Sequence, residues 1–373
     1  MKKFLLFAVA ILLGLNLLHA QSFKFAVLCD TRSNGHENGK NGVNVSAVKA
    51  ICQHLKEQGA VLVLAPGDFI CGNVKWYEPT PPANATQFQS FLEAAASQGI
   101  GLPGSNMEIP LYPVRGNHEC YQQILPGDSI KAAWMKSIGY TLPANGPKNE
   151  IGFTYSFTYN NSLFLGVDEY MHASSSQKKG IGLNQAWVNR VLKNNPKAKH
   201  VFVFGHTPAF AAHHKDCLGE QPLRRDVFLR SIYQRGGIYF CGHDHFYARA
   251  KVPVFKPDNS TIKGYIQQVI TPSGAPFLTG NRSDNHKWDG EYQNKMVIPE
   301  TYIDNAVGYQ LVTVDKDKVT VQFIATYDAC SYTKNGSGEY TYTFNDNWEN
   351  WNFSIMDQFS LQKKNRSRQL VSK

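Results

Sequence analysis

The chain has 373 residues, of which 42% are hydrophobic and 18% are charged, and its formal net charge is +9. This length is enough to bury a full hydrophobic core. The positive charges are spread along the chain, apart from the terminal "KKNRSRQLVSK", which we interpret as a solvated tail. No motif of a nucleic-acid-binding module is present, so the charge indicates at most an attraction for anionic substrates.

The first 20 residues have the pattern of a secretory signal peptide. The basic "MKK" precedes the apolar "FLLFAVAILLGLNLL", and Ala20 offers a cleavage site before Gln21. The alternative is an uncleaved membrane anchor, but the run is short for a spanning helix and has no stop-transfer flank. No Cys follows the cleavage site, which argues against a lipoprotein anchor. Because no other long apolar run occurs, we expect a secreted or periplasmic protein without a membrane span.

Seven cysteines lie beyond the predicted cleavage site, at Cys29, Cys52, Cys71, Cys120, Cys217, Cys241 and Cys330. An oxidising compartment favours disulfides, so we expect some of them to pair, and the odd count leaves at least one over. Cys29 and Cys241 end apolar runs and can equally be small buried residues.

Short apolar runs alternate with helical patterns along the first two thirds of the chain. The predicted strands are 23–29, 61–65, 110–114, 153–159, 163–167, 200–204 and 237–241. The predicted helices are 44–58, 85–98, 128–138, 183–194 and 222–235. This alternation predicts an α/β fold in which helices cover sheets.

The last third of the chain has a β pattern. "GYQLVTV" and "KVTVQFI" alternate apolar and polar residues on either side of "DKDK", which predicts a hairpin. Neither an internal repeat nor a low-complexity linker is present. We therefore expect one main domain over 21–327, followed by a β-rich C-terminal extension and basic tail over 328–373.

Side chains able to bind metal follow five of the predicted strands. They are Asp30 after 23–29, Asp68 after 61–65, Asn117, His118 and Glu119 after 110–114, His206 after 200–204, and His243 and His245 after 237–241. In open α/β sheets, sites form at the carboxyl ends of strands, and a Gly in four of these turns lets the chain bend sharply. One such residue is ordinary in a turn, but five turns together indicate a metal site. Mixed nitrogen and oxygen ligands favour Zn, Mn or Fe over Ca.

The five turns read "DTR", "GD", "GNHE", "GH" and "GHDH" in chain order. With these motifs the chain resembles the calcineurin-like metallophosphoesterase superfamily over residues 24–250. "GHDHFYAR", the later "GAPF" and the closing "GYQLVTVD" and "MDQFSLQK" look most like the purple acid phosphatase branch. The resemblance implies an αββα sandwich of two facing mixed β-sheets flanked by helices, with 21–327 as the catalytic domain.

The resemblance also implies a role for each residue of these motifs. Asp68 would bridge two metal ions, Asn117, His206 and His243 would complete the second ion's site, and Asp30 and His245 would hold the first ion. His118 would protonate the leaving oxygen or stabilise the charged transition state, with Glu119 orienting its imidazole. Two cations can clamp the attacking and leaving oxygens of an in-line displacement at phosphorus. A neighbouring acid is an ordinary means of fixing the tautomer of a histidine.

These roles predict a secreted phosphoric ester hydrolase that uses two divalent or trivalent ions and an in-line attack by a metal-bound hydroxide. We favour a phosphomonoesterase of the acid phosphatase kind, acting on a small phosphorylated substrate. One alternative is a phosphodiesterase acting on nucleotide or glycerophosphodiester-type substrates. Another is a non-catalytic member that binds a phosphorylated ligand, although the intact "GNHE" argues against it.

The chain departs from the family pattern at the first ion. Arg32 stands where the pattern has a His two residues after Asp30, and Cys71 stands where the branch has a Tyr three residues after Asp68. A guanidinium stays protonated and cannot donate an electron pair to a metal.

Four arrangements of the first ion remain open. In the one we favour, Asp30, Asp68, His245 and waters hold the ion, and the fork of Arg32 points at the substrate phosphate. In the others, His36 completes the site, Cys71 binds as a thiolate, or the first ion is missing altogether.

Two histidines, His213 and His214, follow the "GHTP" turn and are candidates for contacting the phosphate. The alternative is a pair of exposed loop residues. We expect Arg115 to be structural, and Tyr247 and Arg249 to pack beneath the site.

Overall fold

The computed structural model of the protein describes residues 22–33, 40–74, 82–120, 128–171, 181–274, 296–334, 336, 340–364 and 367–370. The predicted signal peptide, His36 and most of the "GAPF" loop lie outside these residues.

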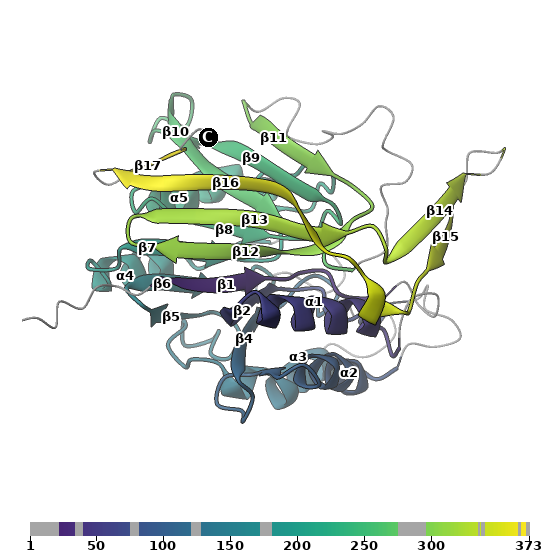
Figure 1. Ribbon diagram of the computed structural model, residues 1–373. Coiled ribbons are helices and arrows are strands. Elements are labelled where there is room, and N and C mark those ends of the chain that lie inside the picture. The colour runs from purple at the N-terminus through teal and green to yellow at the C-terminus, as the bar shows by residue number, and fades with distance from the viewer. Residues whose placement is uncertain are drawn as a thin grey trace, which may run out of the picture.

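An eight-stranded sheet contains both the first strand of the domain and the last strands of the chain (Figure 1). Its order is β17 (Ser367–Leu370), β16 (Ser354–Lys364), β13 (Lys318–Thr326), β12 (Val307–Asp315), β1 (Phe23–Val27), β2 (Ala60–Pro66), β4 (Ile109–Val114) and β3 (Ile100–Gly101). Strands β1, β2 and β4 are parallel, whereas β12, β13 and β16 are antiparallel. The carboxyl ends of β1, β2 and β4 therefore meet at one edge of the sheet.

A seven-stranded sheet faces the first one. Its order is β11 (Ile298–Ile303), β9 (Tyr247–Phe255), β10 (Ile262–Ile270), β8 (Ile238–Cys241), β7 (His200–Phe204), β6 (Ser162–Gly166) and β5 (Tyr155–Tyr159). Strands β6, β7, β8 and β10 are parallel, and β5, β9 and β11 pair antiparallel to their neighbours.

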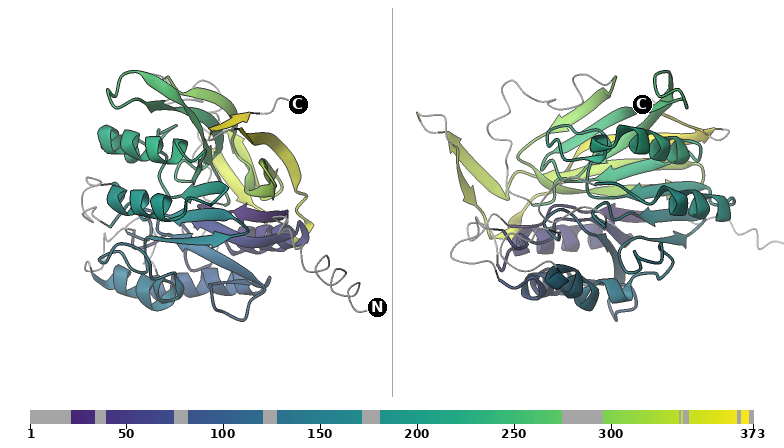
Figure 2. Two further views of the ribbon diagram at one scale, coloured as in Figure 1. Left: turned by 90° about the vertical axis from the view of Figure 1, so that its left-hand side faces the viewer. Right: turned by 180° about the vertical axis from the view of Figure 1, so that it is seen from behind.

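Helices pack on the outer faces of both sheets (Figures 1 and 2). The helices on the eight-stranded sheet are α1 (Val45–Glu57), α2 (Asn84–Ala96) and α3 (Asp128–Ser137). The helices on the seven-stranded sheet are α4 (Gln185–Asn194) and α5 (Pro222–Tyr233). The side chain of Asn44 accepts a hydrogen bond from the first turn of α1, and Asn184 does the same for α4. Such caps satisfy backbone donors that a helix start leaves without partners.

Aromatic side chains fill the space between the two sheets. The ring of Phe25 on β1 lies 5.2 Å from that of Phe164 on β6 and 4.8 Å from that of Phe202 on β7, both edge to face. All three side chains are fully buried. Burying this much apolar surface stabilises the sandwich and fixes the two sheets face to face. The predicted α/β sandwich, its seven strands, its five helices and the late β12–β13 hairpin are confirmed.

The chain beyond residue 328 divides between two places. Strands β14 (Cys330–Lys334) and β15 (Tyr340–Phe344) form a separate hairpin that projects from the body of the protein (Figure 1). Strand β16 instead pairs with β13 in the eight-stranded sheet. Its Asp357 accepts hydrogen bonds from Tyr247 and Arg249 of β9 and so ties the two sheets together. The division at residue 328 stays a prediction.

The expected disulfides are not present, because all seven cysteines are free. Five of them are fully buried core residues, as proposed for Cys29 and Cys241. Burial in an apolar environment disfavours the thiolate and raises the pKa of the Cys52 thiol to about 12. A buried, protonated thiol is a poor partner in disulfide exchange. Among the described residues, none of the helices combines the length and the apolar composition that a membrane-spanning segment requires.

Candidate metal centre

The structure brings the predicted ligands of both sheets together at the carboxyl ends of five strands. All of them are buried: Asp30 follows β1, Asp68 follows β2, Asn117 follows β4, His206 follows β7, and His243 and His245 follow β8. The groups Asp68–His206–His243 and Asp30–Asp68–His245 each have ligand atoms within 4.8 Å of one another. We call Asp30, Asp68 and His245 the first cluster, and Asp68, Asn117, His206 and His243 the second cluster.

Four of these ligands have a left-handed backbone. The φ angles are 57° at Asp30, 55° at Asp68, 74° at His243 and 57° at His245. Residues with a Cβ rarely adopt positive φ, and such strain is found where function requires a particular geometry. The turns therefore hold these side chains at a cost in local backbone energy.

Two glycines beside the ligands leave no room for a side chain. A Cβ at Gly116 would collide with the carboxylate of Asp68, and a Cβ at Gly242 would collide with that of Asp30. These glycines allow the loops of different strands to approach until the ligand atoms meet.

The second cluster has the geometry of a metal site. Oδ1 of Asn117 lies 2.8 Å from Nε2 of His206 and 3.0 Å from Nδ1 of His243. Oδ2 of Asp68 lies 3.4 Å from Nε2 of His206. Ligand atoms bound at about 2.0–2.1 Å to one ion lie roughly 2.9–3.4 Å apart, so these separations fit a common ion.

In His206 and His243, the ring nitrogen that points away from Asn117 has its own partner, which leaves the nitrogen that faces Asn117 available to an ion. Nδ1 of His206 lies 2.8 Å from the carbonyl oxygen of Pro66, which can only accept, so Nδ1 carries the proton. Nε2 of His243 lies 3.3 Å from the carboxylate of Asp216. Each ring therefore faces Asn117 with the nitrogen that would bind an ion after losing any proton it carries, an arrangement typical of metal-binding histidines.

The charge state of His206 shows the same need for a cation. The ring is fully buried, which lowers the pKa, but the carboxylates of Asp68 and Asp30 more than reverse this and raise it to about 10. Oδ2 of Asp68 and Oδ1 of Asp30 are buried without a hydrogen-bond donor among the described residues. Buried carboxylate oxygens of this kind require a positive charge, so the residues present fit a divalent ion.

Arg32 lies at the first cluster, with 5% of the residue exposed. Its Nη2 is 3.5 Å from Nε2 of His245, and its Nε is 4.0 Å from Oδ2 of Asp68. Burial, together with the positive charge of Arg32, lowers the pKa of His245 well below its usual value. The thiol of Cys71 donates to the carbonyl oxygen of Ser33 at 2.7 Å and therefore does not serve as a thiolate ligand in this arrangement.

His118 lies at the edge of both clusters. Its Nδ1 is 2.6 Å from the carbonyl oxygen of Cys71, and its Nε2 is 3.9 Å from Oδ2 of Asp68. Burial and the charge of Arg32 lower the pKa of His118 to about 3, so the ring is neutral near pH 7.

Glu119 has a different place from the one expected. Its carboxylate accepts hydrogen bonds from the backbone N–H groups of Asp68, Phe69, Ile70 and Gly116, at distances of 2.7–3.3 Å. The carbonyl of Cys71, rather than Glu119, meets Nδ1 of His118. Because a carboxylate can accept several bonds at once, Glu119 holds together the turns that follow β2 and β4. It is a positioning residue for Asp68.

His214 lies beside the second cluster, whereas His213 lies one ring further out. The ring centroids of His214 and His243 are 4.7 Å apart, and those of His213 and His214 are 4.3 Å apart. Asp244 holds this loop, because its carboxylate accepts from the backbone N–H groups of Ala212, His213 and His214 and lies 3.0 Å from Nδ1 of His214. This role of Asp244 was missed from the sequence, although the residue lies within "GHDH".

Two further buried acids support the ligands and were also missed. Glu169 accepts from the backbone and hydroxyl of Thr207, next to His206, and from the hydroxyl of Tyr239. Asp168 pairs with Arg115 at 2.6 Å, which confirms the structural role expected for that arginine. Both acids follow β6, in a loop without any motif in the sequence that marks it.

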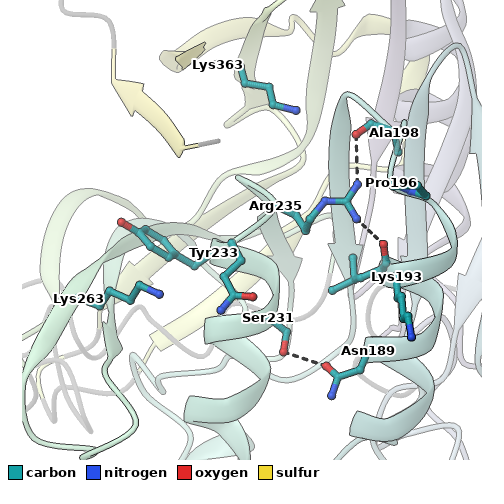
Figure 3. Close-up of a pocket in the computed structure, with 11 residues that line it drawn as sticks. Asn189, Lys193, Pro196, Ala198, Ser231, Tyr233, Arg235, Lys263 and Lys363 are labelled. Atoms are coloured by element: carbon teal, nitrogen blue, oxygen red, sulfur yellow. Dashed lines mark hydrogen bonds between the residues drawn. The ribbon is translucent and has the colours of Figure 1, made fainter. Parts of the chain in front are cut away.

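A separate basic cleft of about 970 Å³ lies at the other end of the seven-stranded sheet (Figure 3). Its cationic lining residues are Lys193, Arg235, Lys263 and Lys363. Arg235 donates to carbonyl oxygens at the end of α4, among them that of Asn195 at 2.8 Å, and Lys363 donates to that of Lys199. A cation at the carboxyl end of a helix stabilises the helix dipole, so the charge of Arg235 serves the fold. None of the predicted site residues lines this cleft.

Comparisons with known proteins identify the family of the chain and agree with its fold. A family model for calcineurin-like phosphoesterases matches residues 23–247. No curated protein matches the sequence. Among solved structures, PhoD is similar with a TM-score of 0.60 and 14% identity, over 94% of this chain and 72% of PhoD. The purple acid phosphatase PPD1 from yellow lupin (Lupinus luteus) is similar with a TM-score of 0.55 and 14% identity, over 93% of this chain and 55% of that protein. GAP50, the anchor in the inner membrane complex of Plasmodium, is similar with a TM-score of 0.50 and 13% identity, over 87% of this chain and 89% of that protein.

Proposed function

Because the chain belongs to the calcineurin-like phosphoesterase family, its reaction is the hydrolysis of phosphate esters, and we propose that its substrates are small phosphate monoesters. The observation that carries metal-dependent hydrolysis is the second cluster, in which a carboxylate, an amide oxygen and two imidazoles converge. Asp68, Asn117, His206 and His243 would hold a divalent ion such as Zn, Mn or Fe. When bound, such an ion activates water and neutralises charge on the phosphate.

His118 would serve the leaving group. The carbonyl of Cys71 keeps its proton on Nδ1 and directs Nε2 toward the clusters. A dianionic phosphate close to Nε2 would raise the low pKa of this ring. The imidazole would then take up a proton with the substrate and return it to the leaving oxygen, which is general acid catalysis.

The groups beside the clusters favour a monoester over a diester. The guanidinium of Arg32 and the ring of His214 lie beside the ligands, and a monoester presents more negative charge and more free oxygens to them. A fork of N–H donors matches phosphate oxygens well. In this proposal, Arg32 and His214 bind the phosphate group and His213 supports His214.

The test compares 4-nitrophenyl phosphate with bis(4-nitrophenyl) phosphate, after removal of bound metal and reconstitution with Zn, Mn or Fe. Preferred turnover of the monoester supports the proposal, and preferred turnover of the diester makes the protein a phosphodiesterase. His243→Ala is the control, because it removes an ion ligand and should abolish either activity. If neither ester reacts with any metal while inorganic phosphate binds, the protein is a non-catalytic phosphate-binding member.

We also propose that the protein is exported and that residues 1–20 are removed. The basic start, the apolar run and Ala20 support this location. Fractionation of the host and determination of the amino-terminal residue of the mature protein test it. A mature chain that begins at Gln21 outside the cytoplasm is the expected result, and an intact Met1 in the cytoplasmic fraction contradicts it.

A further inference from the structure

The guanidinium of Arg32 lies among the atoms that could hold an ion in the first cluster. Its Nη2 is 3.5 Å from Nε2 of His245, which in turn is 3.5 Å from Oδ1 of Asp30. Its Nε is 4.0 Å from Oδ2 of Asp68. The guanidinium therefore lies about as close to His245 and Asp68 as His245 lies to Asp30.

Backbone and side-chain contacts hold Arg32 in this place. Its backbone N–H donates to the carbonyl oxygen of Asp68 at 3.0 Å, and its Nη1 donates to that of Ser33 at 3.3 Å. The thiol of Cys71 donates to the same oxygen of Ser33. Only 6% of the Arg32 side chain is exposed. The loop after β1 and the turn after β2 are thus built around this guanidinium.

A metal ion and this guanidinium compete for the same position. The guanidinium is always protonated, so it can neither ligate an ion nor lose its charge to make room for one. Two positive charges at close range repel strongly in a buried site, where water screens them poorly. The carboxylate of Asp68 is fully buried and requires a positive charge, which Arg32 supplies at 4.0 Å from its Oδ2.

We propose that Arg32 takes the place of the metal ion in the first cluster, so that the protein binds a single divalent ion, in the second cluster. The inference deepens the proposed function and rests on it for the role of the site. The second positive charge next to the phosphate then comes from the guanidinium. This replaces the arrangement expected from the sequence, in which Asp30, Asp68, His245 and waters hold an ion.

The two histidines of "GHDH" provide a matched test. His243 belongs to the second cluster and His245 to the first. Both residues are buried and lie in the turn that follows β8. After reconstitution with Zn or Mn, elemental analysis should find one ion per chain in the wild type and in His245→Ala, but none in His243→Ala. Two ions in the wild type, with one lost in His245→Ala, would overturn the inference. Circular dichroism identifies any variant that fails to fold.

Changing Arg32 tests the same point from the other side. Arg32→His replaces the cation with a neutral ligand and should raise the ion content from one to two per chain. With Mn, its electron paramagnetic resonance spectrum should change from that of an isolated ion to that of a spin-coupled pair. Arg32→Lys keeps the charge and should keep a single ion. A coupled pair already present in the wild type would contradict the inference, as would a second ion bound by Arg32→Lys.

These measurements are independent of turnover. A wild type with one ion that hydrolyses no phosphate ester would refute the proposed function and leave the role of Arg32 in place. A wild type with two ions that hydrolyses esters would refute the role of Arg32 and leave the proposed function in place.

Discussion

Nδ1 of His118 lies 2.6 Å from the backbone carbonyl oxygen of Cys71, and this contact joins the turn after β4 to the turn after β2. A carbonyl oxygen only accepts hydrogen bonds, so the contact places the proton of the neutral ring on Nδ1. Nε2 is then directed toward Asp68, at 3.9 Å from its Oδ2. The backbone, and not a neighbouring acid, sets the tautomer of the histidine that we propose as the proton donor.

Replacing His118 by Asn should slow the hydrolysis of esters with poor leaving groups. General acid catalysis contributes about 10²–10⁴-fold, so kcat for an alkyl phosphate should fall within this range. An aryl phosphate with a stable leaving group should lose much less, and the ion content should stay the same. The ratio of the two kcat losses is the measurement, and an unchanged rate on the alkyl phosphate would remove His118 from the mechanism.

Glu119→Gln should weaken both the fold and the ion site. The variant places an amide nitrogen against backbone N–H donors of the turns after β2 and β4, which leaves a buried donor without an acceptor. The free energy of unfolding should fall by about 1–3 kcal/mol, and the ion should bind less tightly. Denaturant titration and competition with a chelator measure the two effects.

Glu93→Gln is the control for this substitution. Glu93 is exposed on α2, so its replacement should change the free energy of unfolding by less than about 0.5 kcal/mol. Equal losses in the two variants would mean that Glu119 does not position Asp68.

Asp168→Asn should be strongly destabilising. The variant leaves the Arg115 guanidinium buried, with only 1% of the residue exposed, and without a counter-charge. Removing one partner of such a pair costs about 3–5 kcal/mol. Glu108→Gln breaks the exposed pair with Lys56 at 2.8 Å and should cost less than about 1 kcal/mol. Denaturant titration compares the two losses, and similar values would contradict the prediction.

Glu169 should make the stability of the metal-free protein depend on pH. Burial raises its pKa from 4.5 to about 7, although Tyr239 and Thr207 donate hydrogen bonds to it. The folded state therefore holds the proton more tightly than the unfolded chain. This contribution to stability is complete below about pH 4.5 and is lost as the pH rises through about 7.

The measurement is the free energy of unfolding at pH 4.5 and pH 8, for wild type and Glu169→Gln, in the presence of a chelator. Between these values the wild type should lose on the order of 1–3 kcal/mol more than the variant, which cannot ionise at this position. Parallel pH profiles would mean that Glu169 does not titrate in this range.

The order of the elements could be predicted from the sequence because each element has a local signature. Strand β2 is a continuous apolar run, β1 and β7 are apolar except at Lys24 and His200, and α1 and α4 have apolar residues at helical spacing. The candidate metal ligands follow these strands within a few residues. Parallel strands bring their carboxyl ends to one edge, so the meeting of Asp30, Asp68 and Asn117 follows from local pattern and sheet geometry.

The predictions that were wrong concerned contacts between residues far apart in the chain. Glu119 was assigned to its sequence neighbour His118, but its carboxylate meets backbone groups 49–51 residues earlier. Some cysteines were expected to pair because of the oxidising compartment, yet all seven are free and five of them are buried. Neither outcome has a local signature, because both depend on which loops the packed sheets bring together.

The sequence by itself determined the α/β fold with helices over sheets and the places of the candidate ligands after the strands, because these depend on apolar periodicity and on short motifs; the sandwich of two sheets came from the family resemblance. Only the tertiary structure decided what surrounds the ligands. Loops of different strands bring several groups to the centre: the carbonyl of Cys71, the acids Asp216, Asp244 and Glu169, and the guanidinium of Arg32. Hydrogen bonds and charges act over a few ångströms in space, and chain order does not encode those distances.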